Sequence, residues 1–204
     1  MNDDLANRIR KAYPNGLTES LDRSVLDSPE RDERIRKVIA AVSQTCSLNA
    51  TVDSAQGISY EISFTQDDHP HFEDWVVMPR DKKLDWIACN HGDPYPVFWL
   101  KISRIADYYY YFYNHWVPRG NTGYLDHDFI RQPNSIWKEH ERRICDELDR
   151  NGFALLSDDL AGEQVDFVLD HDDFAIPEND PRRLDEKFTP PLIPTTIHDC
   201  LFSQ

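Results

Sequence analysis

Apolar residues in the first quarter of the chain recur at helical spacing. Leu5, Ile9 and Tyr13 stand four residues apart and would line one face of a helix. A second helix is expected to begin at residues 28–30, where a serine cap, a proline and a glutamate follow one another. Its apolar stripe is Ile35, Val38, Ile39 and Val42. Its basic residues are expected to face water and to form ion pairs along the helix: Arg31, Arg34, Arg36 and Lys37.

The period of the pattern changes to two between residues 48 and 117. Apolar residues alternate with polar ones from Ile58 to Phe64, which predicts a half-buried antiparallel strand. Residues 97–105 alternate in the same way, and with the aromatic-rich segment 108–116 that follows they predict a hairpin. Residues 72–78 and 84–89 are shorter strand candidates. Together these segments predict an antiparallel meander of about four to six strands.

A further helix is predicted over residues 135–150, capped by Asn134-Ser135 and followed by Gly152 as the terminating residue. After it, short apolar patches at 153–156 and 196–202 are predicted to be strands within acidic, proline-rich sequence. The predicted fold class is α+β, in one domain spanning residues 1–204. N-terminal helices pack on an antiparallel meander sheet, followed by a helix and an irregular acidic C-terminal region.

Charge narrows the classes of function. The 204 residues carry a formal charge of −15, which argues against a protein that coats nucleic-acid backbones. No apolar run approaches the ~20 residues that cross a bilayer, and the N-terminus does not resemble a secretion signal. The four cysteines are far apart in sequence and are expected to be free, buried thiols. We therefore expect a cytoplasmic protein that binds neither nucleic acid nor membrane.

The negative charge is concentrated late in the chain. Residues 151–181 contain nine acids and neither lysine nor arginine. Such a run either keeps the protein in solution or is relieved by a cationic partner. The acids expected to attract such a partner are Asp158, Asp159, Asp166, Asp170, Asp172 and Asp173.

Six consecutive aromatic residues occupy positions 108–113. In a strand, Tyr109, Tyr111 and Tyr113 share one face, and their neighbours take the other. Tyrosine contributes strongly to binding at interfaces, so these three residues are the expected partner-binding anchors. The alternatives are that the rings fill the core, or that the tyrosine face joins copies of the chain in a structural homo-oligomer.

Catalytic signatures are missing from the sequence. It contains no nucleophile elbow, no glycine-rich phosphate loop and no zinc-protease motif. We therefore expect a protein that is not an enzyme and has no cofactor or metal. The competing hypothesis is a metal-assisted hydrolase that uses some of the histidines with acids near them. The candidates are His69, His71, His127 and His171.

In overall character the chain resembles the immunity proteins of bacterial toxin systems, which are small, acidic and aromatic-rich. The resemblance covers no definable motif. It implies an acidic binding protein that neutralises a basic protein partner. That partner would be a cognate toxin, for example a nuclease whose substrate groove the acids block by imitating phosphate spacing.

Overall fold

The computed structural model describes most of the chain. The described residues are 3–14, 21–26, 28–53, 57–66, 69–70, 72–90, 95–119, 124–130, 135–165 and 195–202.

A single antiparallel sheet forms the centre of the described structure. Its strands pair in the order in which they follow along the chain. They are β1 (Leu48–Asp53), β2 (Ser59–Gln66), β3 (Tyr95–Ser103), β4 (Tyr108–Arg119) and β5 (Tyr124–Ile130). A short sixth strand, β6 (Ala154–Leu155), pairs in parallel with the start of β4. The predicted meander and its aromatic hairpin are therefore confirmed.

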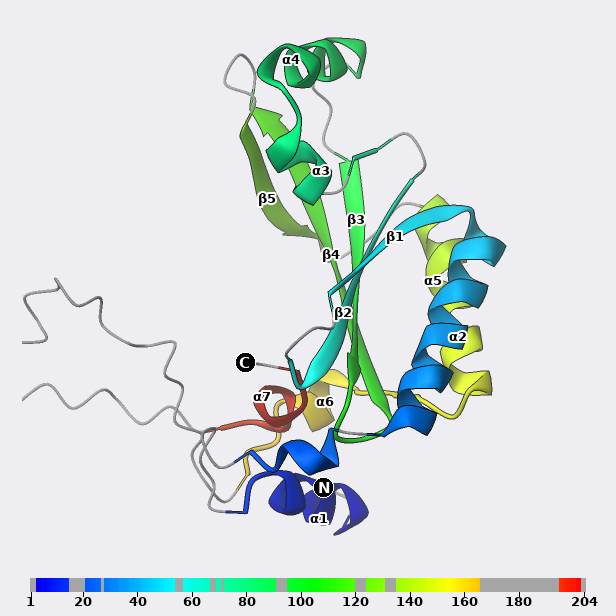
Figure 1. Ribbon diagram of the computed structural model, residues 1–204, viewed down its shortest axis with the longest axis vertical. Coiled ribbons are helices and arrows are strands. Elements are labelled where there is room, and N and C mark those ends of the chain that lie inside the picture. The colour runs from blue at the N-terminus through cyan, green and yellow to red at the C-terminus, as the bar shows by residue number, and fades with distance from the viewer. Residues whose placement is uncertain are drawn as a thin grey trace, which may run out of the picture.

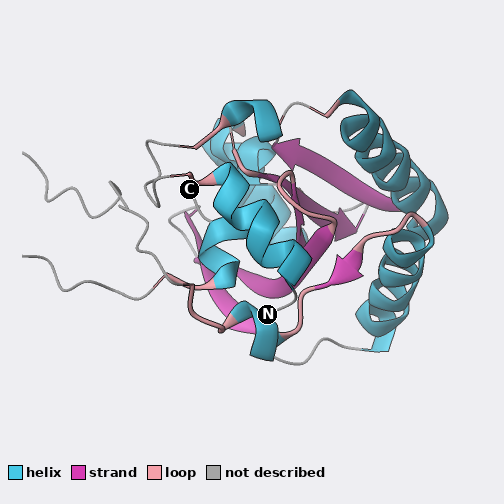
Figure 2. Cartoon of the chain, turned by 90° about the horizontal axis from the view of Figure 1, so that it is seen from below, coloured by secondary structure: helices cyan, strands magenta, loops and turns pink. Residues whose placement is uncertain are grey.

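Helices cover one face of this sheet and gather at its two ends (Figure 1). The two long helices, α2 (Pro29–Cys46) and α5 (Ser135–Arg150), lie side by side along one face. Figure 2 shows the same pair on one side of the strands. Helices α3 (Phe72–Val77) and α4 (Arg80–Cys89) stand at one end of the sheet. The other end holds α1 (Asp3–Ala12), η2 (Arg23–Val25), α6 (Asp158–Ala161) and α7 (Ile197–Phe202). The predicted α+β class is confirmed.

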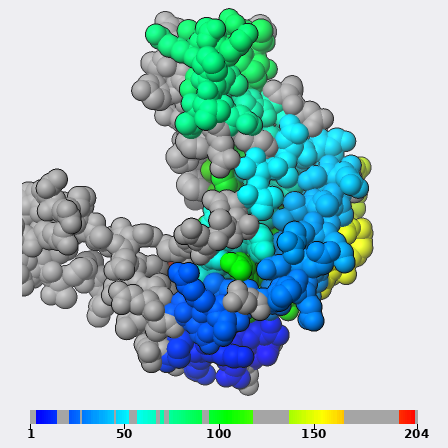
Figure 3. All heavy atoms as spheres, in the orientation of Figure 1, coloured from blue at the N-terminus to red at the C-terminus, as the bar shows by residue number. Residues whose placement is uncertain are grey.

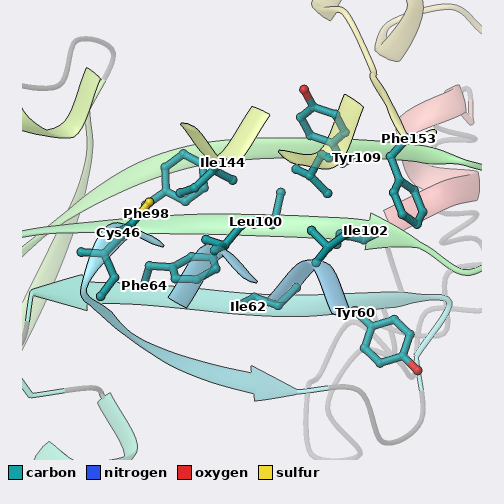
Figure 4. Close-up of a cluster of buried hydrophobic side chains, with 14 of the residues drawn as sticks. Cys46, Tyr60, Ile62, Phe64, Phe98, Leu100, Ile102, Tyr109, Ile144 and Phe153 are labelled. Carbon is teal, nitrogen blue, oxygen red and sulfur yellow. The ribbon is translucent and has the colours of Figure 1, made fainter. Parts of the chain in front are cut away.

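The main core lies between the sheet and the two long helices. Ile62 and Phe64 of β2 and Phe98 and Leu100 of β3 are at most 1% exposed and point towards α2 and α5. Figure 4 shows these side chains packed together, with Ile144 of α5 above them. The alternation of residues along β2 and β3 therefore gives this face its apolar character.

Three segments predicted to be strands are helices. Residues 72–78 and 84–89 lie mainly in α3 and α4, and residues 196–202 lie mainly in α7. In α7 the buried residues Ile197, Cys200 and Leu201 follow helical spacing. Thr196 and Asp199 also cap its start, since the Thr196 N–H donates to Asp199 Oδ2 at 2.8 Å and the Asp199 N–H donates to Thr196 Oγ1 at 3.3 Å. The helical spacing and the Thr196–Asp199 cap can both be recognised in the sequence, and both favour a helix.

Helix α5 ends at Arg150, and Gly152 follows it with a left-handed φ of +79°, as predicted. A Cβ at this position would lie 3.7 Å from Arg34 Nη1, an ordinary contact, so backbone strain dominates the cost of a substitution. Gly152→Ala is expected to lower the free energy of unfolding by about 1 kcal/mol in urea titrations. Gly162→Ala is the matched control, because Gly162 has a φ of −81°. An equal loss in both variants would contradict this reasoning.

Candidate functional site

The structure places the three expected tyrosine anchors beneath α5. Tyr109 is 1% exposed and Tyr113 is 4% exposed, while Tyr111 is half-buried. Figure 4 shows the Tyr109 ring beside α5. These rings belong to the main core, so they do not present the open aromatic surface that the sequence interpretation required of them.

Carboxylates of α5 accept hydrogen bonds from all three tyrosine hydroxyls. Tyr111 donates to Glu141 Oε1 at 2.8 Å, and Tyr113 donates to Glu141 Oε2 at 2.9 Å. Tyr109 donates to Asp149 Oδ1 at 3.3 Å. Burial is the main cause that raises the pKa of each tyrosine. The hydroxyls were expected to need water, but α5 supplies their acceptors, and the three tyrosines thereby hold α5 on the sheet.

The expected acids lie elsewhere or beyond what the structure describes. Asp158 and Asp159 are exposed in the first turn of α6, which Ser157 caps. The charge of Asp158 reaches Tyr110, whose pKa is raised by burial and then by this carboxylate. The other four acids lie outside the described residues: Asp166, Asp170, Asp172 and Asp173.

The opposite side of the same strands forms a second aromatic surface. We call it the open face, because no described helix lies over its middle, between α3 at one end and α7 at the other (Figure 1). Figure 3 shows that the molecule is hollowed between α4 and α1 on this side. The hairpin strands supply its residues from the positions that alternate with Tyr109, Tyr111 and Tyr113.

Two neighbouring cross-strand rows make up the middle of the open face. In the first row, Ser63 pairs with Trp99, and Trp99 pairs with Phe112. The Trp99 and Phe112 rings are half-buried and nearly parallel, with centroids 6.2 Å apart. This row is therefore an aromatic strip that remains partly accessible to a ligand or partner.

The second row is charged. Glu61 pairs with Lys101, and Lys101 pairs with Tyr110. Lys101 Nζ lies 2.7 Å from Glu61 Oε1 and also donates to the Phe202 carbonyl of α7 at 3.4 Å. The Tyr110 ring meets His198 of α7 edge-on, with centroids 5.0 Å apart. Burial lowers the pKa of His198 and favours its neutral form; the charge of Asp199 opposes this effect, and the charge of Lys101 adds to it.

Several buried polar atoms on this face make no hydrogen bond to any described residue, among them Trp99 Nε1 and Asn114 Oδ1. Asn114 is 7% exposed and lies diagonally across the β3–β4 pair from Trp99. A buried polar group without a partner costs about 1–3 kcal/mol, so the open face has unmet hydrogen-bonding capacity beside its aromatic strip.

The structure offers little support for a metal centre within the part that it describes. No group of three or more metal-ligating side chains occurs among the described residues. His69 stacks on Tyr95, with centroids 4.6 Å apart. His71 and His171 lie outside the described residues, and of His127 only the backbone pairing in β5 is described. The metal-assisted hydrolase therefore has no site in this part of the molecule.

The four cysteines are all free, as expected, but they are not all buried. Cys46 and Cys200 are buried and Cys145 is half-buried, whereas Cys89 is exposed at the end of α4. Helix α4 contains no buried residue, so its last position is open to solvent.

Sequence reasoning missed the open face because it assigned the two sides of the aromatic strand the wrong way round. A signal was present in the helix at 135–150. Its buried stripe runs through Trp137, Ile144 and Leu148, and Glu141 falls on the same stripe. A carboxylate facing a core needs donors, and tyrosine hydroxyls are the donors that the neighbouring strand offers.

None of the described helices is long and apolar enough to cross a membrane. Comparison of the chain with protein-family models, with curated proteins and with solved structures finds no match.

Proposed function

We propose that this chain is a binding protein that takes up a basic protein on its open face. We further propose that the partner is an enzyme that it inhibits, as an immunity protein inhibits its toxin. The observation that carries the proposal is the half-buried Trp99–Phe112 strip on a sheet face whose middle no described helix covers. Aromatic side chains in such a setting supply much of the binding energy of protein interfaces.

The charge of the chain supports a basic partner. The net charge is −15, and the described acids Asp158 and Asp159 are exposed beside the end of the face that Tyr110 occupies. On the face itself, the charge of Lys101 is already matched by Glu61. A cation-rich surface would therefore meet aromatic rings with negative charge next to them, an arrangement that speeds association and selects against acidic partners.

The proposal places the protein in the cytoplasm, where its four free cysteines remain reduced.

The test measures association with any basic protein that a neighbouring gene encodes, by surface plasmon resonance at several salt concentrations. Trp99→Ala is expected to raise the dissociation rate roughly tenfold, because it removes an aromatic anchor. The pair Asp158→Asn and Asp159→Asn is expected to slow association and to flatten its salt dependence.

The matched control neutralises two acids on the outer side of α5, Glu139→Gln with Asp146→Asn. Their partners are arginines of the same helix, so association should stay close to that of the native chain. Native dissociation in Trp99→Ala, or equal effects of the two acid pairs, would contradict the proposed surface. Light scattering that shows dimers broken by Trp99→Ala would instead assign the face to a second copy of this chain.

A further inference from the structure

Three arginines converge on one aspartate at the end of the sheet where α1 and the start of α2 meet the β3–β4 turn (Figure 1). Arg8 Nη1 lies 3.6 Å from Asp107 Oδ2, and Arg31 Nε lies 3.4 Å from Asp107 Oδ1. Arg34 Nη2 forms a close ion pair with Asp107 Oδ1. We call these four residues the arginine cluster. The helical pattern predicted that Arg31 and Arg34 face water, whereas in the structure both form ion pairs with Asp107.

Among the described residues, the carboxylates that contact the cluster do not balance its positive charge. Arg8 has a second partner, because its Nε lies 3.0 Å from Asp4 Oδ2. Asp32, in the first turn of α2, lies instead against the Tyr60 hydroxyl and helps to raise the pKa of that tyrosine, after burial. Three guanidinium groups thus face the two carboxylates of Asp107 and Asp4. One positive charge remains in a chain whose net charge is −15.

On its buried side, the cluster has too little negative charge and too few hydrogen-bond acceptors for its guanidinium groups. The Arg31 side chain is only 14% exposed. Burial lowers its pKa, and the charges of Arg8 and Arg34 lower it further, so that Asp107 offsets these effects only in part. Arg31 Nη1 donates to the Arg104 carbonyl, and Arg31 Nε is held by its ion pair with Asp107. The Nε atoms of Arg31 and Arg34 are buried and have no well-aligned hydrogen bond to any described residue. A guanidinium has five N–H donors, so this cluster holds more donors than its acceptors use.

The outer side of the cluster is open to solvent. The side chains of Arg8, Arg34 and Asp107 are 40%, 35% and 32% exposed, respectively. Arg31 lies in the first turn of α2, where the helix dipole adds partial positive charge. Arg34 is held in place from below, since its guanidinium lies 4.4 Å from the centroid of the Phe153 ring.

We infer that the arginine cluster binds a small oxyanion, a phosphate or a carboxylate, through the exposed guanidinium groups of Arg8 and Arg34. Planar guanidinium groups match both kinds of oxyanion with paired, charge-assisted hydrogen bonds. The site is separate from the open face and does not rest on the proposed function. It supplies the chain with one place where an acidic group is attracted.

Isothermal titration of the purified chain tests the site with three probes: inorganic phosphate, acetate, and sodium chloride at matched ionic strength. Saturable binding of phosphate or acetate is expected, and the better of the two identifies the type of oxyanion. Arg8→Gln and Arg34→Gln are each expected to weaken this binding about tenfold, the loss typical of one charge-assisted contact.

Arg142→Gln is the matched control, because Arg142 is 60% exposed on α5 and pairs with Glu139 and Asp146 of its own helix. It should leave the titration unchanged. If Arg34→Gln fails to fold, Arg8→Gln still decides the question, since Arg8 is more exposed. Heats that match those of sodium chloride, or saturable binding that survives both cluster variants, would overturn the inference and leave the cluster a structural clamp.

Discussion

Glu141→Ala is expected to lower the free energy of unfolding by roughly 3 kcal/mol, because two buried or half-buried hydroxyls lose a charged acceptor at once. Tyr111 and Tyr113 both donate to this one carboxylate, at 2.8 and 2.9 Å. In Glu141→Ala, Tyr113 keeps only its longer bond to the Trp137 carbonyl, at 3.4 Å. Urea titration followed by circular dichroism measures the change.

Helix α5 offers a matched control for this prediction. Glu139 lies two residues earlier, is 46% exposed and pairs only with arginines of the same helix among the ion pairs described. Glu139→Ala should therefore change stability little, as exposed pairs generally do. Glu141→Gln keeps one acceptor oxygen, so its loss should fall between those of the two alanine variants. Similar losses in both alanine variants would mean that helix propensity, rather than the tyrosine bonds, sets the effect.

Alkaline pH is expected to unfold the protein steeply. Burial raises the pKa of Tyr13, Tyr95, Tyr109 and Tyr113, and these side chains are at most 4% exposed. Above about pH 10 the unfolded chain loses protons that the folded chain retains, so stability falls as pH rises. Each tyrosine contributes about 1.4 kcal/mol per pH unit, and the four together roughly 5 kcal/mol per pH unit. Below that range their stabilisation is fully present.

Ionisation of Cys200 also lowers the stability of the fold as pH rises, and its effect begins at a lower pH than that of the tyrosines. Burial raises the pKa of its thiol to about 12, whereas an unfolded thiol ionises near pH 8.5. Urea titrations at several pH values measure the slope, and tyrosinate absorbance reports ionisation directly. Tyr109→Phe should reduce the fall in stability with pH by the contribution of one tyrosine, about 1.4 kcal/mol per pH unit. Full tyrosinate absorbance near pH 10 with native circular dichroism would show that the rings are not sealed in the fold.

Local patterns in the sequence were enough to predict much of the fold. The cap at Ser28, the alternation over 58–64 and the helix at 135–150 each depend on neighbouring residues, and each is present in the structure. The short segments at 72–78 and 84–89 failed because a few apolar residues suit either period. Helix α4 in particular contains no buried residue, so no stripe distinguishes it from a strand.

The candidate site was harder to predict, because it depends on which face of a strand is covered. Residues 108–113 offer aromatic rings to both sides, so the strand itself does not show which side faces the core. The choice is made by residues distant in sequence, chiefly Glu141 on α5. In the same way, Asp107 is 73 residues from Arg34, and the residues around Arg34 in the sequence do not predict their contact.

The acceptors on α5 also settle how β4 aligns with its neighbours. A slip of one residue would exchange the two sides of the strand, yet aromatic rings would still face both ways. Such a slip would bring Phe112, which has no hydroxyl, to the Glu141 carboxylate in place of a tyrosine. The tyrosine–glutamate contacts therefore discriminate between two alignments that hydrophobicity alone would leave almost equal in energy. By excluding the shifted alignment, the half-buried carboxylate of Glu141 keeps Trp99 and Phe112 together on the open face.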